Sequence, residues 1–164
     1  MDTKNIVEIK HLNFSYPDGT VALKDTNLAL QEGSITALIG QNGCGKSTLS
    51  KLMNGILKPT SGSIMVGDLD VSAGCSVKDL VLNIGYVFQN PDHQLFNASV
   101  YDEIAYAPRN VDLSEEEVDT RVHEAADIAG VSESLFKESP MLVSRGIRQR
   151  IAIASILSLK PKLI

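Results

Sequence analysis

The residues of this chain that could do chemistry begin at Gly40, where a glycine-rich run leads into Lys46 and Ser47. The spacing of Gly, four residues and then Gly-Lys-Ser is the phosphate-loop pattern. Glycines let backbone N–H groups close around phosphate oxygens, because no Cβ stands in the way. The lysine would reach the β- and γ-phosphates of a triphosphate, and the hydroxyl of Ser47 would hold Mg²⁺. We therefore predict a nucleotide site formed by Gly40, Asn42, Gly43, Cys44, Gly45, Lys46, Ser47 and Thr48.

A phosphate loop must follow a strand and precede a helix. The apolar run 34–39 predicts a buried strand, and residues 46–53 have the apolar spacing of a helix that ends near Gly55. Further strands are expected over 7–16, around 28–30, over 64–67 and over 83–89.

The second half of the chain is expected to be helical, because serine caps precede its apolar runs. Ser99 opens a helix that Pro108 should close, and Ser114 opens a second helix that Gly130 should end. Ser144 is expected to cap a last helix that runs to about Leu159.

Composition sets outer limits on the function. With 164 residues, one domain with a sizeable core is expected. The net charge of −5 and the lack of a basic stripe argue against a nucleic-acid partner. Cys44 and Cys75 have no zinc-site spacing, and a reducing cytoplasm is expected. Neither a signal peptide nor a membrane span is expected, so membrane association would come through a partner.

The phosphate loop, Gln89 and the segment 143–150, taken in this order, resemble an ABC-type ATPase subunit over residues 7–164. The resemblance implies an α/β P-loop NTPase core sheet, with an antiparallel β-subdomain and a helical subdomain, incomplete at its C-terminus. It implies a single partial nucleotide-binding domain over 1–164. Its parts would be a β-rich phosphate-loop core over about 1–90, a helical subdomain over 91–143, and a signature helix with the start of the Walker B strand over 144–164.

The resemblance also implies roles for single residues around ATP and Mg²⁺. Tyr16 matches the aromatic residue that stacks on adenine, although an ordinary strand aromatic is the alternative. Gln89 matches the catalytic glutamine that touches Mg²⁺ or the attacking water, with an exposed polar residue as the alternative. Ser144 and Gly146 match the signature residues that contact the γ-phosphate bound to the opposite subunit.

The segment 88–96 is similar to the ATPase subunits of energy-coupling-factor importers, which take up vitamins and metal ions such as cobalt. This similarity implies that ATP binding and hydrolysis drive such uptake. The implied partners are a second ABC ATPase subunit, as homodimer or heterodimer, and a transmembrane coupling subunit at the cytoplasmic face of the membrane. His93 has no metal-ligand partner at usable spacing, so a surface or contact role is expected for it.

Two departures from the family pattern favour an alternative. Arg145 and Ile147 replace a glycine and a glutamine of the signature, and residues 159–164 resemble only the beginning of the Walker B strand. Positions for the family's Mg²⁺-binding Asp, its catalytic Glu and its γ-phosphate His are absent, so the chain alone is expected to bind ATP weakly and to hydrolyse it negligibly. The alternative is a non-catalytic nucleotide-binding or interaction protein that pairs with an intact ATPase. An ABC-like ATPase acting on DNA or ribosomes fits less well, because no long coiled-coil insertion is present.

The side chain of Arg145 should hinder a backbone position that the family leaves bare. We predict that Arg145→Gly together with Ile147→Gln tightens ATP-driven dimerisation of a completed domain. Sedimentation or solution scattering with and without ATP would measure this, and unchanged dimerisation would contradict the prediction.

Overall fold

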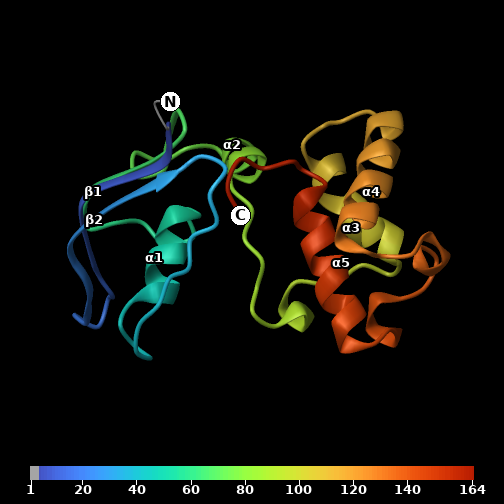
Figure 1. Cartoon of the computed structure of the whole chain (residues 1–164), viewed down its shortest axis with the longest axis horizontal. Coiled ribbons are helices and arrows are strands. Elements are labelled where there is room, and N and C mark those ends of the chain that lie inside the picture. The colour runs from blue at the N-terminus through green and yellow to red at the C-terminus, as the bar shows by residue number, and fades with distance from the viewer. Residues whose placement is uncertain (1–3) are drawn as a thin grey trace. The chain divides into compact units, whose positions relative to one another are not determined.

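The computed structural model describes residues 4–164, which form two compact units (Figure 1). The first unit ends at Ile84 and also takes in Leu163. The second unit comprises residues 85–162 and Ile164. Each unit has its own cluster of buried apolar side chains, so each is described by itself.

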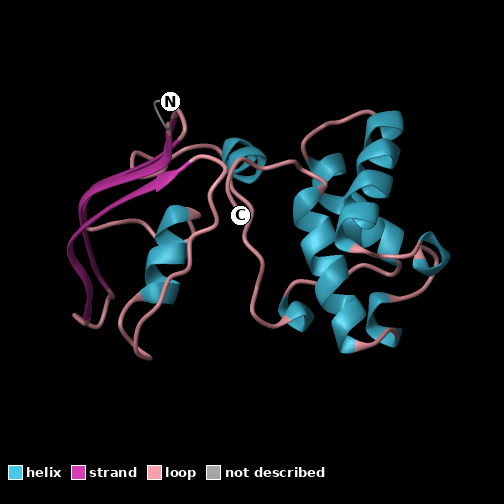
Figure 2. Ribbon diagram, viewed as in Figure 1, coloured by secondary structure: helices cyan, strands magenta, loops and turns pink. Residues whose placement is uncertain are grey.

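The first unit is built on a four-stranded antiparallel sheet (Figure 2). Its strands are β1 (Asn5–Ser15), β2 (Val21–Gln31), β3 (Ser61–Val66) and β4 (Leu69–Asp70), in the order β2-β1-β3-β4. Helix α1 (Lys46–Met53) packs on this sheet through buried Leu49 and Leu52. The sheet and α1 share one core, whose buried strand residues are Ile6, Val7, Ile9, Leu12, Phe14, Leu23, Ile64 and Val66.

Strand β1 carries a bulge that dictates a glycine on β3. Lys10 pairs with Ser63 and Asn13 with Ser61, so two residues of β1 face the single residue Gly62. His11, the first residue of the bulge, has φ 50°. A Cβ on Gly62 would overlap the His11 carbonyl oxygen and lie 2.6 Å from its carbonyl carbon. Position 62, with φ 92°, therefore requires glycine for both space and backbone conformation.

The second unit is helical (Figure 2). Helices α3 (Val100–Asn110), α4 (Glu115–Ala129) and α5 (Arg145–Leu157) contact one another pairwise. Three short 3₁₀ turns accompany them: η1 (Pro91–His93) precedes α3, and η2 (Glu133–Leu135) and η3 (Pro140–Leu142) lie between α4 and α5. The core of the unit comprises Leu95, Val100, Ile104, Ala105, Val118, Val122, Ala125, Ala126, Val131, Ile151, Ala152 and Ala154.

A polar contact also joins α3 to α4. The Tyr101 hydroxyl donates to Asp119 Oδ1 at 2.8 Å. Burial, reinforced by this hydrogen bond, raises the pKa of Tyr101 to about 12. The phenol therefore stays a donor throughout the neutral range.

The serine caps of the three long helices are confirmed. The side chain of Ser99 accepts from Asp102 N, that of Ser114 from Glu117 N, and that of Ser144 from Ile147 N. Gly130 ends α4 in the left-handed conformation, with φ 68°.

The expectation that Pro108 closes its helix is wrong. Pro108 lies inside α3, which continues to Asn110. A proline removes one N–H donor, but its fixed φ suits a helix, and here only the last turn lies beyond it.

Two predicted strands do not form. Residues 34–39 have no regular secondary structure, and the side chains of Ile35 and Ile39 are fully exposed. Residues 77–83 form the helix α2 (Val77–Asn83), which the sequence did not predict, and beyond it only Ile84 makes a parallel bridge, to Leu163. The physical reason is that a strand needs a neighbour for its N–H and C=O groups, and within residues 4–164 no segment pairs with 34–39 or with 85–89.

Gly62 and Gly19 give a matched pair for testing the bulge. Both have φ near +90°, but a Cβ on Gly19 would meet nothing within 4 Å. Gly19→Ala should cost about 1 kcal/mol of unfolding free energy, through strain alone. Gly62→Ala should cost at least about 3 kcal/mol, because the overlap with the β1 backbone adds to the strain. Urea unfolding of both variants measures the difference, and equal losses would show that the bulge does not crowd position 62.

Candidate functional site

The glycine loop of the predicted nucleotide site is seated against strand β2. Gly45 precedes α1 with φ 92°, and a Cβ there would lie 2.9 Å from the Ala22 carbonyl oxygen and 3.0 Å from Leu23 Cδ2. Gly43 also has a positive φ, of 82°. Both positions need glycine for their backbone conformation, and Gly45 needs it for space as well. The loop therefore leads into α1 with exposed backbone, which is what a phosphate cradle requires.

Lys46 points back over this loop. Its ammonium donates to the carbonyl oxygens of Gly40 and Gln41 at 2.8 and 2.7 Å, and Cys44 Sγ lies 3.7 Å away. An ammonium can donate three hydrogen bonds, and here two of them go to neutral carbonyl oxygens of the loop. These bonds hold the positive charge of Lys46 beside the loop. A phosphate oxygen entering the loop could replace these acceptors with a stronger, charge-assisted bond.

Tyr16 and Thr48 are brought together, although 32 positions separate them. The Tyr16 hydroxyl lies 2.8 Å from Thr48 Oγ1, and Thr48 is buried in the first turns of α1. The ring of Tyr16 meets that of Phe14 edge to face, with centroids 4.9 Å apart. The hydroxyl contact thus places an aromatic ring beside the helix that the phosphate loop opens. Ser47 and Asn42 are exposed.

The remaining predicted site residues belong to the second unit. Gln89 is exposed in the segment that precedes η1. Ser144 is the exposed N-cap of α5, and a Cβ on Gly146 would meet nothing within 4 Å. The backbone at Ser144 and Gly146 is therefore open to solvent.

A group of polar side chains that no sequence motif predicts holds the segment after Gln89. Buried Glu103 accepts from the backbone N–H groups of Phe96 and Asn97 at 2.9 and 2.7 Å. Gln94 bonds to the backbone at Phe88 and to α5. A signal for Glu103 was present in the sequence, since it lies among the apolar residues Val100, Ile104 and Ala105 of one helix.

Arg148 adds an ionic contact to this group. Its Nε lies 2.9 Å from Asp92 Oδ1, but the N–H is not directed at the oxygen, so the contact is an ion pair and no hydrogen bond. Its Nη1 donates to the Val143 carbonyl oxygen at 2.9 Å.

A pocket of about 370 Å³ lies between α4 and the end of α5. It is lined by Arg121, Glu124, Ala125, Asp127, Ile128, Leu157, Lys160 and Pro161. Lys160 Nζ and Glu124 Oε2 form an ion pair across it at 2.6 Å. None of the predicted site residues lines this pocket.

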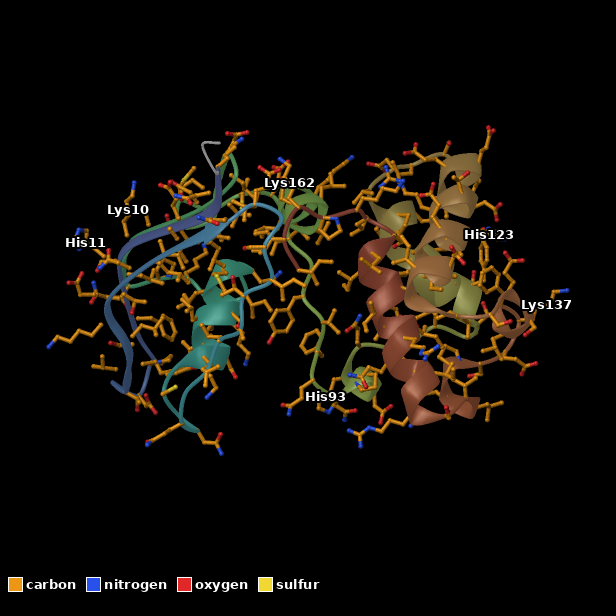
Figure 3. The ribbon with its side chains drawn as sticks, in the orientation of Figure 1. Lys10, His11, His93, His123, Lys137 and Lys162 are labelled. Carbon is orange, nitrogen blue, oxygen red and sulfur yellow. The ribbon has the colours of Figure 1, made fainter. Side chains whose placement is uncertain are left out.

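Residues 4–164 contain no cluster of three or more His, Cys, Asp or Glu side chains that could hold a metal ion. His93 lies in η1 and His123 in α4, on separate elements (Figure 3). Within the same residues, no helix is both long and apolar enough to cross a bilayer.

Comparison with known proteins identifies the family of this chain. The sequence model of the ABC transporter family matches residues 23–164. The chain belongs to the ABC transporter family. It is 42% identical, over 163 residues, to the energy-coupling factor transporter ATP-binding protein EcfA2 of Caldanaerobacter subterraneus subsp. tengcongensis. It is 46% identical, over 160 residues, to the corresponding protein EcfA of Methanosphaera stadtmanae. These matches cover 96% and 97% of the chain and 57% of each relative.

Solved structures show the same fold. CbiO1 from Clostridium perfringens, described as part of the ABC transporter complex cbiONQ, matches with a TM-score of 0.84 and 42% identity over 97% of this chain and 64% of its own. The ATP-binding cassette MJ0796, solved as a dimer in a post-hydrolysis state with ADP and Pi, matches with a TM-score of 0.79 and 27% identity over 94% and 70%. The fold is therefore that of an ABC ATPase, with an antiparallel sheet and a helical part. The chain spans rather more than half the length of these two curated relatives.

The contact between Tyr16 and Thr48 can be measured by a double-mutant cycle with Tyr16→Phe and Thr48→Val. Each single change should lower the unfolding free energy by about 1 kcal/mol, and their coupling should be about 0.5–1.5 kcal/mol, because the two changes remove the same hydrogen bond. Tyr86→Phe controls for the loss of a tyrosine hydroxyl as such, since within residues 4–164 the Tyr86 hydroxyl makes no hydrogen bond. A coupling near zero in urea unfolding would contradict the contact.

Proposed function

We propose that this chain is the nucleotide-binding part of an ATP-binding subunit of an energy-coupling-factor importer. The proposal rests chiefly on the glycine loop. Gly43 and Gly45 adopt conformations that leave the backbone bare, and the Lys46 ammonium is held at the loop by two carbonyl oxygens. The relatives named as energy-coupling factor transporter ATP-binding proteins support the class of transporter.

The loop residues 40–48 would hold the phosphates of ATP. Lys46 would exchange the Gly40 and Gln41 carbonyl oxygens for phosphate oxygens, and the Tyr16 ring would stack on adenine. The Ser47 hydroxyl and the Gln89 amide oxygen suit Mg²⁺, because this ion prefers oxygen ligands. When bound, Mg²⁺ would neutralise part of the negative charge of the phosphates.

The proposed subunit works in pairs and with a membrane partner. MJ0796 was solved as a dimer, and cbiO1 is described as part of a transporter complex. These descriptions support a second ABC ATPase subunit, identical or different, whose bound γ-phosphate would meet Ser144 and Gly146. The description of cbiO1 also supports further subunits of a transporter, and the proposed one is a transmembrane coupling subunit that would hold this chain at the cytoplasmic face of the membrane. ATP binding and hydrolysis in this assembly would drive uptake of a metal ion or vitamin.

A second candidate is a non-catalytic nucleotide-binding protein that pairs with an intact ATPase. Its support is Arg145, which is the first residue of α5 and lies exposed beside the cap Ser144. A charged side chain there changes the surface that would face a second subunit's nucleotide.

ATP affinity tests the loop directly, and α1 offers a matched control. Lys46→Ala should weaken ATP binding about 10- to 100-fold, because a charge-assisted contact to phosphate contributes about 1.5–3 kcal/mol. Lys51→Ala removes the same charge in the last turn of α1, away from the loop, and should change the affinity by less than about twofold. Calorimetry or a fluorescent ATP analogue measures both. Equal affinities for the wild type and Lys46→Ala would refute phosphate binding at the loop.

A further inference from the structure

Gln94 connects two parts of the second unit with one side chain. It lies at the end of η1, five positions after Gln89. Its Oε1 accepts from the backbone N–H of Phe88 at 3.2 Å, and its Nε2 donates to the Ala152 carbonyl oxygen at 2.7 Å and to Ser155 Oγ at 3.0 Å. The amide therefore joins the residue before Gln89 to the middle of α5.

The hydrogen bonds settle which end of the amide points where. Phe88 N–H is a donor and can meet only the amide oxygen, while the Ala152 carbonyl is an acceptor and can meet only the NH₂ group. Ser155 fits the same orientation, because its hydroxyl donates to the Ala152 carbonyl oxygen at 3.0 Å and its lone pairs remain for Gln94. All of the bonds agree on one orientation of the amide.

A second contact attaches the same segment to an earlier turn of α5. Asp92, in η1, is paired with Arg148, whose guanidinium also donates to the carbonyl of Val143, the residue before the cap Ser144. The segment 88–94 is thus attached to α5 at two levels. Asp92 is about half exposed, so its ion pair is screened by water, whereas Ala152 and Ser155 are buried. The two bonds from Gln94 to α5 are therefore better shielded from water than the ion pair, whereas its bond to Phe88 lies in an exposed part of the segment.

We propose that Gln94 is a positioning residue that fixes the backbone at Gln89 to α5, the helix that Ser144 caps. The roles of Gln89 at Mg²⁺ and of Ser144 at a second subunit's γ-phosphate rest on the proposed function. Because a helix moves as a rigid body, a displacement of α5 at Ser144 is carried through Ala152 and Gln94 to Phe88. Gln94 thereby makes the position of Gln89 depend on the position of the signature segment.

Hydrogen exchange at the Phe88 backbone amide, followed by nuclear magnetic resonance, tests the attachment without any nucleotide. Gln94→Leu keeps the side-chain bulk and removes all three hydrogen bonds, so the Phe88 amide should exchange roughly five- to tenfold faster. Ser155→Ala removes one of the three bonds, so exchange of the Phe88 amide should rise about twofold. This variant should fold fully, because alanine suits a helix interior.

Gln149→Leu is the matched control, because Gln149 is an exposed glutamine on the same helix α5. The Phe88 amide should exchange at the wild-type rate in this variant. Unchanged exchange in both Gln94→Leu and Ser155→Ala would overturn the proposal. If Gln94→Leu does not fold, the proposal is tested by Ser155→Ala alone. The Phe88 amide should then exchange faster in Ser155→Ala than in Gln149→Leu.

The dependence of ATP affinity on Mg²⁺ tests the consequence for Gln89. Affinity is measured with Mg²⁺ and with a chelator in its place. Gln94→Leu should leave the ATP affinity measured with the chelator unchanged. It should lower the increase in ATP affinity that Mg²⁺ produces about tenfold, the usual order for loss of a group that orients a metal ligand. A merely structural loss would weaken both affinities alike. An unchanged gain from Mg²⁺ would overturn the role of Gln94 at Gln89.

The two measurements distinguish a failure of the proposed function from a failure of the proposed role of Gln94. If the wild-type chain binds no ATP, or gains nothing from Mg²⁺, the proposed function is contradicted. The exchange rate of the Phe88 amide then still decides whether Gln94 fixes the backbone beside Gln89.

Discussion

The packing of α1 on the antiparallel sheet is the interaction on which the rest of the site depends. Leu49 and Leu52 bury one face of the helix in the sheet's core, and burying two leucines contributes about 3–6 kcal/mol. This contact fixes the start of α1 so closely against β2 that only glycine fits at position 45. The loop, the Lys46 ammonium and the Tyr16 ring all take their places from that fixed helix end.

Local signals allowed the sequence to predict the helices and the loop. A serine cap needs only a backbone N–H three residues on, so Ser99, Ser114 and Ser144 could be recognised from short stretches of sequence. The phosphate loop was recognisable for the same reason. The prediction of a strand over 34–39 is wrong because a strand also depends on a neighbouring strand. Apolar composition does not indicate whether a partner segment is within reach. Helix α2 was missed although Ser76 caps it as the other serines do, because its seven residues bury none of their side chains.

The same distinction separates the site residues that were predicted from those that were missed. The sequence marks Tyr16 as a ring that could meet a base, but its hydroxyl contact to Thr48 cannot be predicted from a short motif, because it joins the residue after β1 to α1 across 32 positions. Gln94 reaches Ala152 across 58 positions, so no short motif could reveal its role. Glu103 bonds within seven positions, and its place among apolar residues could have marked it as a buried, paired carboxylate.

The stability of α5 does not explain why position 145 carries an arginine, as a comparison with the other arginines of this helix shows. Cations are unfavourable near a helix N-terminus and favourable near a C-terminus. Arg148 is balanced by Asp92, and Arg150 donates to the Gly130 carbonyl oxygen at 3.0 Å, at the C-terminal end of α4. Arg145 has neither kind of compensation within residues 4–164, and its side chain is exposed beside the positive end of α5. Its charge adds to the field of the helix end, so this surface attracts anions whether or not the family's glycine would have approached them more closely.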